Sequence, residues 1–121
     1  MIKRIMGLLS AILIVVGVSA CAAPAPTTPP TVEILLTAQD IKWDVDRIEA
    51  KVGQPIVFVI TNEGVLDHNF EISELGVNEN IAVGETIELE LTFDLPGNYD
   101  FVCNVPGHAE AGMVGTITVS E

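Results

Sequence analysis

Four side chains in this sequence have the types and the spacing to hold one soft metal ion. Cys103 and His108 are separated by four residues, as are His108 and Met113, and His68 lies upstream. Thiolate and thioether suit Cu(I), and imidazole suits both oxidation states of copper. Two imidazoles and a thiolate in a trigonal set, with a distant axial thioether, hold copper for electron transfer. We therefore expect one copper ion here, because zinc would gain little from a thioether and calcium needs an oxygen cage.

Each of these residues also has a simpler interpretation. An inward cysteine is usually an inert apolar residue, a single histidine is usually a surface or satisfied core residue, and a methionine before a strand usually packs. A disulfide between Cys103 and Cys21 is disfavoured because Cys21 lies at the end of a flexible segment. A nucleophilic Cys103 with His108 as its base is also disfavoured, because the sequence supplies no plausible third residue to orient the histidine. The joint spacing favours the metal site.

The elements that must position these residues are expected to be short β-strands. From Val32 onward, β-prone runs alternate with Gly, Pro and Asn, and no run keeps the apolar spacing of an amphipathic helix. The expected strands cover residues 32–37, 41–48, 56–62, 68–72, 87–93, 99–103 and 113–119. This spacing predicts an all-β sandwich of seven or eight strands. The run 56–62 is apolar on both parities, which predicts burial on both faces, and Cys103 should point inward.

The N-terminal segment predicts export and tethering. Residues 1–20 combine two basic residues with an apolar run that is short for a membrane span and ends in small residues before Cys21. This pattern resembles a bacterial lipoprotein signal peptide, in which Cys21 becomes the lipidated first residue. The alternatives are a soluble-secretion signal cut close to Cys21 and an uncleaved anchor helix. Residues 21–31 are rich in proline, which predicts an extended tether, and residues 32–121 would form the domain outside the cytoplasm.

Composition and charge narrow the function classes. The chain has 121 residues, which suits a single domain. It carries 17 acidic residues against 5 basic ones, for a formal net charge of -12. Removing the two basic residues of the signal would leave 17 against 3, a charge of -14. Such a chain repels phosphates, so we expect no nucleic-acid partner.

The sequence resembles the cupredoxins, the small blue copper proteins of the plastocyanin, azurin and auracyanin group, over almost all of residues 32–121. The resemblance is carried by residues 48–53, Asp67-His68-Asn69-Phe70, Gly84-Glu85-Thr86, residues 96–103 and the loop from Cys103 to Met113. The Cys-x4-His-x4-Met spacing is that of auracyanin-like proteins, because plastocyanins have a shorter Cys-to-His gap and azurins a shorter His-to-Met gap. The implied fold is a cupredoxin-like Greek-key β-sandwich.

The resemblance implies a role for each ligand and a function. His68, Cys103 and His108 would be the equatorial ligands of one type 1 copper ion, and Met113 the weak axial ligand. A filled coordination sphere leaves no open position for a substrate. The chain has only two histidines, so none remains for a second copper, and the binuclear centre of oxidase subunits needs two cysteines in this loop. We therefore expect an electron shuttle between Cu(II) and Cu(I), and not an enzyme.

Residues next to the ligands are also implied by the resemblance. Asn69 would hydrogen-bond across to the ligand loop, and its backbone N–H would point at the Cys103 sulfur. Asn104 occupies a position that is often Ser or Thr in relatives, where it partners that Asn. Asp67 precedes the first histidine, and a buried carboxylate there would favour Cu(II). We expect the Asp67 side chain to point outward.

The resemblance further implies where electrons enter and leave. In the family, the edge of the ligand-loop histidine reaches the surface through an apolar patch, which here would comprise Val65, Leu66, Pro106, Ala109 and Ala111. The acidic chain, expected to be a monomer, would be steered to a basic partner such as a cytochrome c or a membrane complex. The alternatives are an extracytoplasmic copper carrier or storage protein, and a purely structural module on a stalk. Carriers often display Met-rich or His-rich tracts, which this chain lacks.

Overall fold

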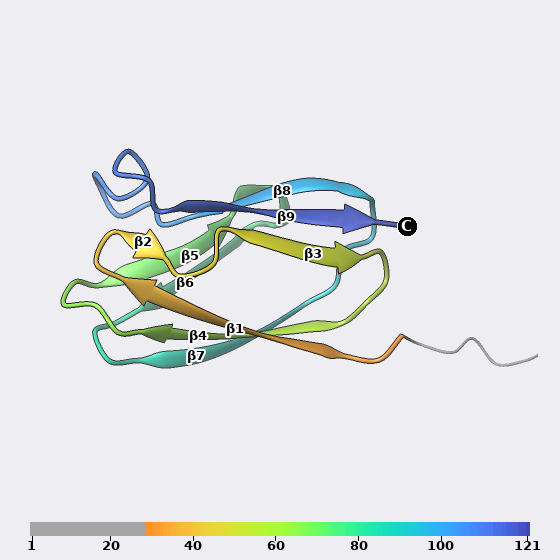
Figure 1. Cartoon of the computed structure of the whole chain (residues 1–121), viewed down its shortest axis with the longest axis horizontal. Coiled ribbons are helices and arrows are strands. Elements are labelled where there is room, and N and C mark those ends of the chain that lie inside the picture. The colour runs from red at the N-terminus through yellow and green to blue at the C-terminus, as the bar shows by residue number, and fades with distance from the viewer. Residues whose placement is uncertain (1–28) are drawn as a thin grey trace, which may run out of the picture.

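Short β-prone runs separated by turns produce an almost all-β structure in the computed structural model, which describes residues 29–121 (Figure 1). The strands are β1 (Val32–Gln39), β2 (Lys42–Trp43), β3 (Arg47–Lys51), β4 (Ile56–Asn62), β5 (His68–Ile72), β6 (Val77–Ile81), β7 (Thr86–Leu91), β8 (Gly97–Val102) and β9 (Val114–Ser120), with the 3-10 helix η1 (Ser73–Leu75) between β5 and β6. In this part of the chain, no helix is long and apolar enough to span a membrane.

The strands form two sheets that face each other, as Figure 1 shows. One sheet has the order β2-β1-β4-β7, and the other has the order β3-β9-β8-β5-β6. Each sheet contains one parallel pair, β1 with β4 and β3 with β9, and its other pairs are antiparallel. The predicted β-sandwich is therefore confirmed for residues 29–121.

The strand predicted over residues 41–48 was wrong. This segment forms two strands in different sheets, because β2 pairs with β1 while β3 pairs with β9. Ile41 has a φ of 59°, which turns the chain sharply between β1 and β2. The Asp44 carboxylate then accepts a hydrogen bond from the backbone N–H of Thr37 at 2.7 Å, just before the chain crosses to the other layer.

Two further details differ from the sequence prediction. β6 was not predicted, and together with the division of residues 41–48 it raises the number of described strands to nine. β4 is buried on one face only: its residues at 56, 58, 60 and 62 are buried, whereas those at 57, 59 and 61 are half-buried. An apolar run with β-branched residues on both parities therefore overstated the burial of the outer face.

Aromatic side chains fix the two strands that lead into the site. Phe70 is the centre of the cluster, with ring centroids 5.8 Å from Trp43, 5.6 Å from Phe58 and 5.4 Å from Phe101. Such pairs contribute about 0.5–1.5 kcal/mol each beyond the area they bury. Phe70 lies on β5, two residues after His68, and Phe101 lies on β8, two residues before Cys103. The core therefore aligns β5 and β8 beneath the predicted ligands.

The connections that follow β1, β4, β6 and β8 all lie at one end of the sandwich, opposite the C-terminus (Figure 1). The β4–β5 connection leads directly into His68, and the β8–β9 connection contains residues 103–113. Residues far apart in the sequence are thus brought to the same end of the molecule.

Candidate metal centre

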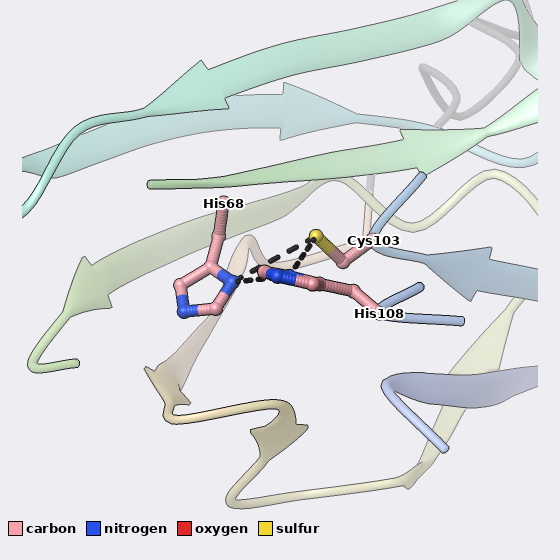
Figure 2. Close-up of side chains that lie close together, drawn as sticks. All are labelled: His68, Cys103 and His108. Atoms are coloured by element: carbon pink, nitrogen blue, oxygen red, sulfur yellow. Dashed lines mark hydrogen bonds between the residues drawn. The ribbon is translucent and has the colours of Figure 1, made fainter. Parts of the chain in front are cut away.

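Three buried side chains direct potential metal-binding atoms toward one another (Figure 2). His68 begins β5, Cys103 follows the last residue of β8, and His108 lies in the β8–β9 loop. The Nδ1 atoms of His68 and His108 are 3.2 Å apart. The Cys103 Sγ lies 3.7 Å from the Nδ1 of His68 and 3.4 Å from the Nδ1 of His108. The exposed fractions are 1%, 0% and 7% for His68, Cys103 and His108, so the group is shielded from water.

The separations of these atoms fit a first-row transition metal. A point equidistant from three atoms that are 3.2, 3.4 and 3.7 Å apart lies inside their triangle, about 2.0 Å from each. Bonds from imidazole nitrogen to such ions are about 2.0–2.1 Å, and bonds from thiolate sulfur about 2.3 Å. The donor set of two nitrogens and a sulfur excludes calcium and magnesium, which bind oxygen. The site therefore fits copper in both the spacing and the chemistry of its donors.

The protonation state of His68 also suits metal binding. Burial, and then the nearby His108, lower the pKa of His68 below its ordinary value of 6.5. The charges of Asp40 and Asp67 and the backbone of Gln39 act in the opposite direction and are weaker. The neutral imidazole, which has a lone pair to give to a metal, is therefore favoured.

The segment before His68 is held by a residue that sequence reasoning missed. Asn62 is buried, and its Nδ2 donates to the carbonyl oxygens of Leu66 at 2.8 Å and Ile81 at 3.0 Å. Its Oδ1 accepts the N–H of Gly64 at 2.9 Å. A Cβ on Gly64 would lie 3.2 Å from the Nε2 of His68, so this segment packs directly against the ring. The signal in the sequence was a polar residue on the buried parity of β4.

The ligand loop is closed by its own main chain. The backbone N–H of Cys103 donates to the carbonyl of Met113 at 3.0 Å, and the N–H of Met113 donates to the carbonyl of His108 at 3.0 Å. Gly107 and Gly112 precede His108 and Met113 with φ values of 88° and 104°, which favour glycine. Met113 is fully buried. The four predicted ligands thus gather in the arrangement of a type 1 copper site.

The expected hydrogen bond from β5 to the ligand loop is present. The Oδ1 of Asn69 accepts the backbone N–H of Asn104 at 2.7 Å, and its Nδ2 donates to the Oδ1 of Asn78 at 2.7 Å. The side-chain amide of Asn104 donates to the carboxylate of Glu71. The contact of the Asn69 backbone N–H with the Cys103 sulfur stays a prediction.

The residues predicted to form an apolar docking patch lie in loops at the metal end. Val65 and Leu66 are 75% and 44% exposed, Pro106 and Ala111 are also exposed, and Ala109 is half-buried. The structure adds Val83, which is 52% exposed and was missed because it lies in the β6–β7 connection, away from the ligand motif.

A hollow of about 210 Å³ opens beside His68. Asp67 and Glu85 line it, and each uses one carboxylate oxygen to accept a backbone N–H: Asp67 that of Val83 at 3.0 Å, and Glu85 that of Ala82 at 2.8 Å. Asp67 is exposed, as expected for an outward side chain. A larger hollow of about 500 Å³ lies over β3 and β9 and shares no residue with the metal group.

The predictions for the N-terminal segment concern residues that lie mostly outside the described part of the chain. Cys21 and the predicted signal peptide lie outside the described residues, as does most of the predicted tether. Within the described part of the chain, Cys103 forms no disulfide and is buried.

Comparison with known proteins agrees with the fold. A family model described as a cupredoxin-like domain matches residues 9–119. Cytochrome c oxidase subunit 2 from Thermus thermophilus is 32% identical over 100 residues, covering 82% of this chain and 73% of the relative. The copper-resistant cuproprotein CopI from Vibrio cholerae is 28% identical over 123 residues, covering 84% of this chain and 73% of the relative.

A solved structure gives the same result for the fold. Auracyanin A, a "blue" copper protein from the photosynthetic bacterium Chloroflexus aurantiacus, superposes with a TM-score of 0.65 at 19% identity, covering 75% of this chain and all of that one. This chain belongs to the cupredoxin-like family, and it is a copper-binding member with one type 1 copper expected at the four clustered residues.

Proposed function

We propose that this chain is an extracytoplasmic blue copper electron-transfer protein that shuttles one electron through Cu(II) and Cu(I). His68, Cys103 and His108 are its equatorial ligands, and Met113 is the weak axial ligand. The observation that carries the proposal is the convergence of three buried donor atoms within 3.7 Å of one another. Copper supplies the redox step, and the ligands suit both of its oxidation states.

The rigid surroundings of the ligands support electron transfer over substrate chemistry. The loop is closed by the main-chain hydrogen bonds between Cys103, His108 and Met113, and Asn62 fixes the segment before His68. Donors already in place need little rearrangement when an electron arrives. With four protein ligands on one copper there is no open coordination position for a substrate, so we propose an electron-transfer protein and not an enzyme.

The surface near the ligands supports docking to a basic redox protein. The apolar patch of Val65, Leu66, Pro106, Ala109 and Ala111 would bring a partner close to the weakly exposed edge of His108. The hollow beside His68 carries Asp67 and Glu85, whose charges suit a lysine or arginine of the partner. A cytochrome c or the basic face of a membrane complex has this chemistry.

The location outside the cytoplasm is proposed from the sequence pattern. Residues 1–20 fit a lipoprotein signal peptide, Cys21 fits the lipidated residue, and residues 21–31 fit a tether. The lipid would hold the domain at a membrane surface while the tether allows it to reach more than one redox partner.

A second candidate function is copper delivery or storage. The similarity to a copper-resistant cuproprotein favours it. The complete burial of Cys103 and Met113 opposes it, because a carrier must release its ion to another protein. The two functions therefore differ in the rate at which copper leaves the protein.

Two rates separate these functions. The copper-loaded protein is reduced with ascorbate and mixed with ferricytochrome c in a stopped-flow instrument, and the loss of copper to a chelator is measured in parallel. Electron transfer predicts oxidation within seconds at micromolar protein and copper loss over hours. Copper loss as fast as electron exchange would contradict the proposal and favour copper delivery or storage.

A further inference from the structure

The residue after Cys103 is held at two points by the same strand. On β5, His68 and Phe70 face the core, while Asn69 and Glu71 alternate with them and reach the loop that follows β8. Asn69 accepts the backbone N–H of Asn104 at 2.7 Å, and the carboxylate of Glu71 accepts its side-chain amide. The pairing of Glu71 with Val102 across β5 and β8 sets this register.

Asn69 and Glu71 are each held in place by a further hydrogen bond. The Nδ2 of Asn69 donates to Asn78 on β6 at 2.7 Å, which turns its Oδ1 toward the loop. The second carboxylate oxygen of Glu71 accepts the hydroxyl of Ser73 at 2.8 Å. Supported hydrogen bonds of this kind orient the groups that bind a metal, and a charged acceptor makes them stronger.

We propose that Glu71 is a positioning residue for the copper site, acting through the side chain of Asn104. A serine or threonine at position 104 would be too short to occupy the same place as the amide, so the asparagine and the glutamate form a matched pair. Holding both ends of Asn104 fixes the peptide unit that follows Cys103, and with it the direction of the sulfur toward His68 and His108. The inference rests on the proposed copper ligation.

The test compares three substitutions. Glu71→Ala removes the acceptor, Glu71→Gln keeps an acceptor oxygen without the charge, and Glu79→Ala is the matched control. Glu79 is exposed on the neighbouring strand β6, and its side chain makes no hydrogen bond to the described residues. The readouts are hydrogen exchange at the Asn104 backbone N–H in the copper-free protein, copper loss to a chelator, and the copper hyperfine splitting in EPR.

We expect Glu71→Ala to speed both the exchange at Asn104 and the copper loss by about threefold to tenfold, because second-layer partners of metal ligands typically contribute about tenfold or more to affinity. It should also change the hyperfine splitting. In Glu71→Gln, the exchange rate at Asn104 and the rate of copper loss should both stay close to those of the unsubstituted protein. Glu79→Ala should match the unsubstituted protein. In a double-mutant cycle, Asn104→Ala should add nothing to Glu71→Ala.

Three outcomes would overturn the inference. Glu71→Ala could behave like Glu79→Ala, Glu71→Gln could be as impaired as Glu71→Ala, or exchange could rise equally at Phe101 in the core, which would indicate general destabilisation. Failure of the unsubstituted protein to bind copper would contradict the proposed function instead. Exchange at Asn104 in the copper-free protein separates the two failures.

Discussion

At the scale of residues, the metal group could be predicted because its chemistry is concentrated in few side chains. After residue 20 the sequence has a single methionine and only two histidines, so His68, Cys103, His108 and Met113 stand out by type and spacing. The structure brings the first three together through their Nδ1 and Sγ atoms. The contact between Glu71 and Asn104 could not be predicted, because it depends on the register of β5 against β8.

Met113 gives a prediction at this scale. The axial ligand tunes the potential of such a site, so Met113→Leu should keep copper and raise the reduction potential, whereas Met113→Gln should lower it. We expect shifts of at least about 59 mV, which is a tenfold change in the relative stability of the two oxidation states for one electron. The potentials are measured by spectroelectrochemical titration. Unchanged potentials in both variants would remove Met113 from the coordination sphere.

At the scale of elements, the strands with clear alternation were predicted and those set by long-range pairing were not. β5 and β7 appear where period-two alternation or a short apolar run predicts them. β6 contains Asn78, Glu79 and Asn80 and is an edge strand, so its pairing with β5 has no apolar signature. The crossing between β2 and β3 depends on partners in different sheets, which a local pattern does not encode.

The contact between β8 and β9 gives a stability prediction. A Cβ on Gly115 would lie 2.1 Å from the nearest ring atom of Phe101, which belongs to the aromatic cluster beneath the site. Within a strand, alanine is more favourable than glycine by roughly 0.5–1 kcal/mol, whereas overpacking a core costs about 1–3 kcal/mol or more. The clash should therefore dominate. Gly115→Ala should therefore lower the free energy of unfolding.

Urea unfolding of the copper-free protein, followed by the fluorescence of Trp43, measures this effect. The control is Thr118→Ala, which is exposed on the same strand and loses only the hydrogen bond from its Oγ1 to Asn98 at 3.1 Å, so its free energy of unfolding should fall by no more than about 1 kcal/mol. A Gly115→Ala variant as stable as the unsubstituted protein would show that Phe101 can move without loss.

At the scale of the whole molecule, charge predicts the salt dependence of partner docking. The described residues include all 17 acidic residues and only 3 of the basic ones, a charge of -14. Exposed charges are screened over about 10 Å at 0.1 M salt. The rate of electron transfer to cationic cytochrome c should therefore fall as salt is raised, whereas the rate with anionic ferricyanide should rise. A rate with cytochrome c that does not respond to salt would reject electrostatic steering.

The whole fold also explains why the sequence predicted the site better than its setting. The ligand motif is local except for His68, whereas the buried Asn62, the aromatic cluster and the hollow beside His68 arise from segments that meet only in the folded sandwich. Such contacts follow from topology, so they become visible only once both sheets are assembled.

The measurement that tests the central claim most directly is a titration of Cu(II) into the purified protein, followed by visible absorption and EPR and then by ascorbate reduction. We expect one equivalent of copper to give an intense blue band from thiolate-to-copper charge transfer, a narrow copper hyperfine splitting, and reversible bleaching. Cys103→Ser should abolish the band. A pale complex, or copper lost at once to a mild chelator, would show that Cys103 is not a ligand in a rigid site.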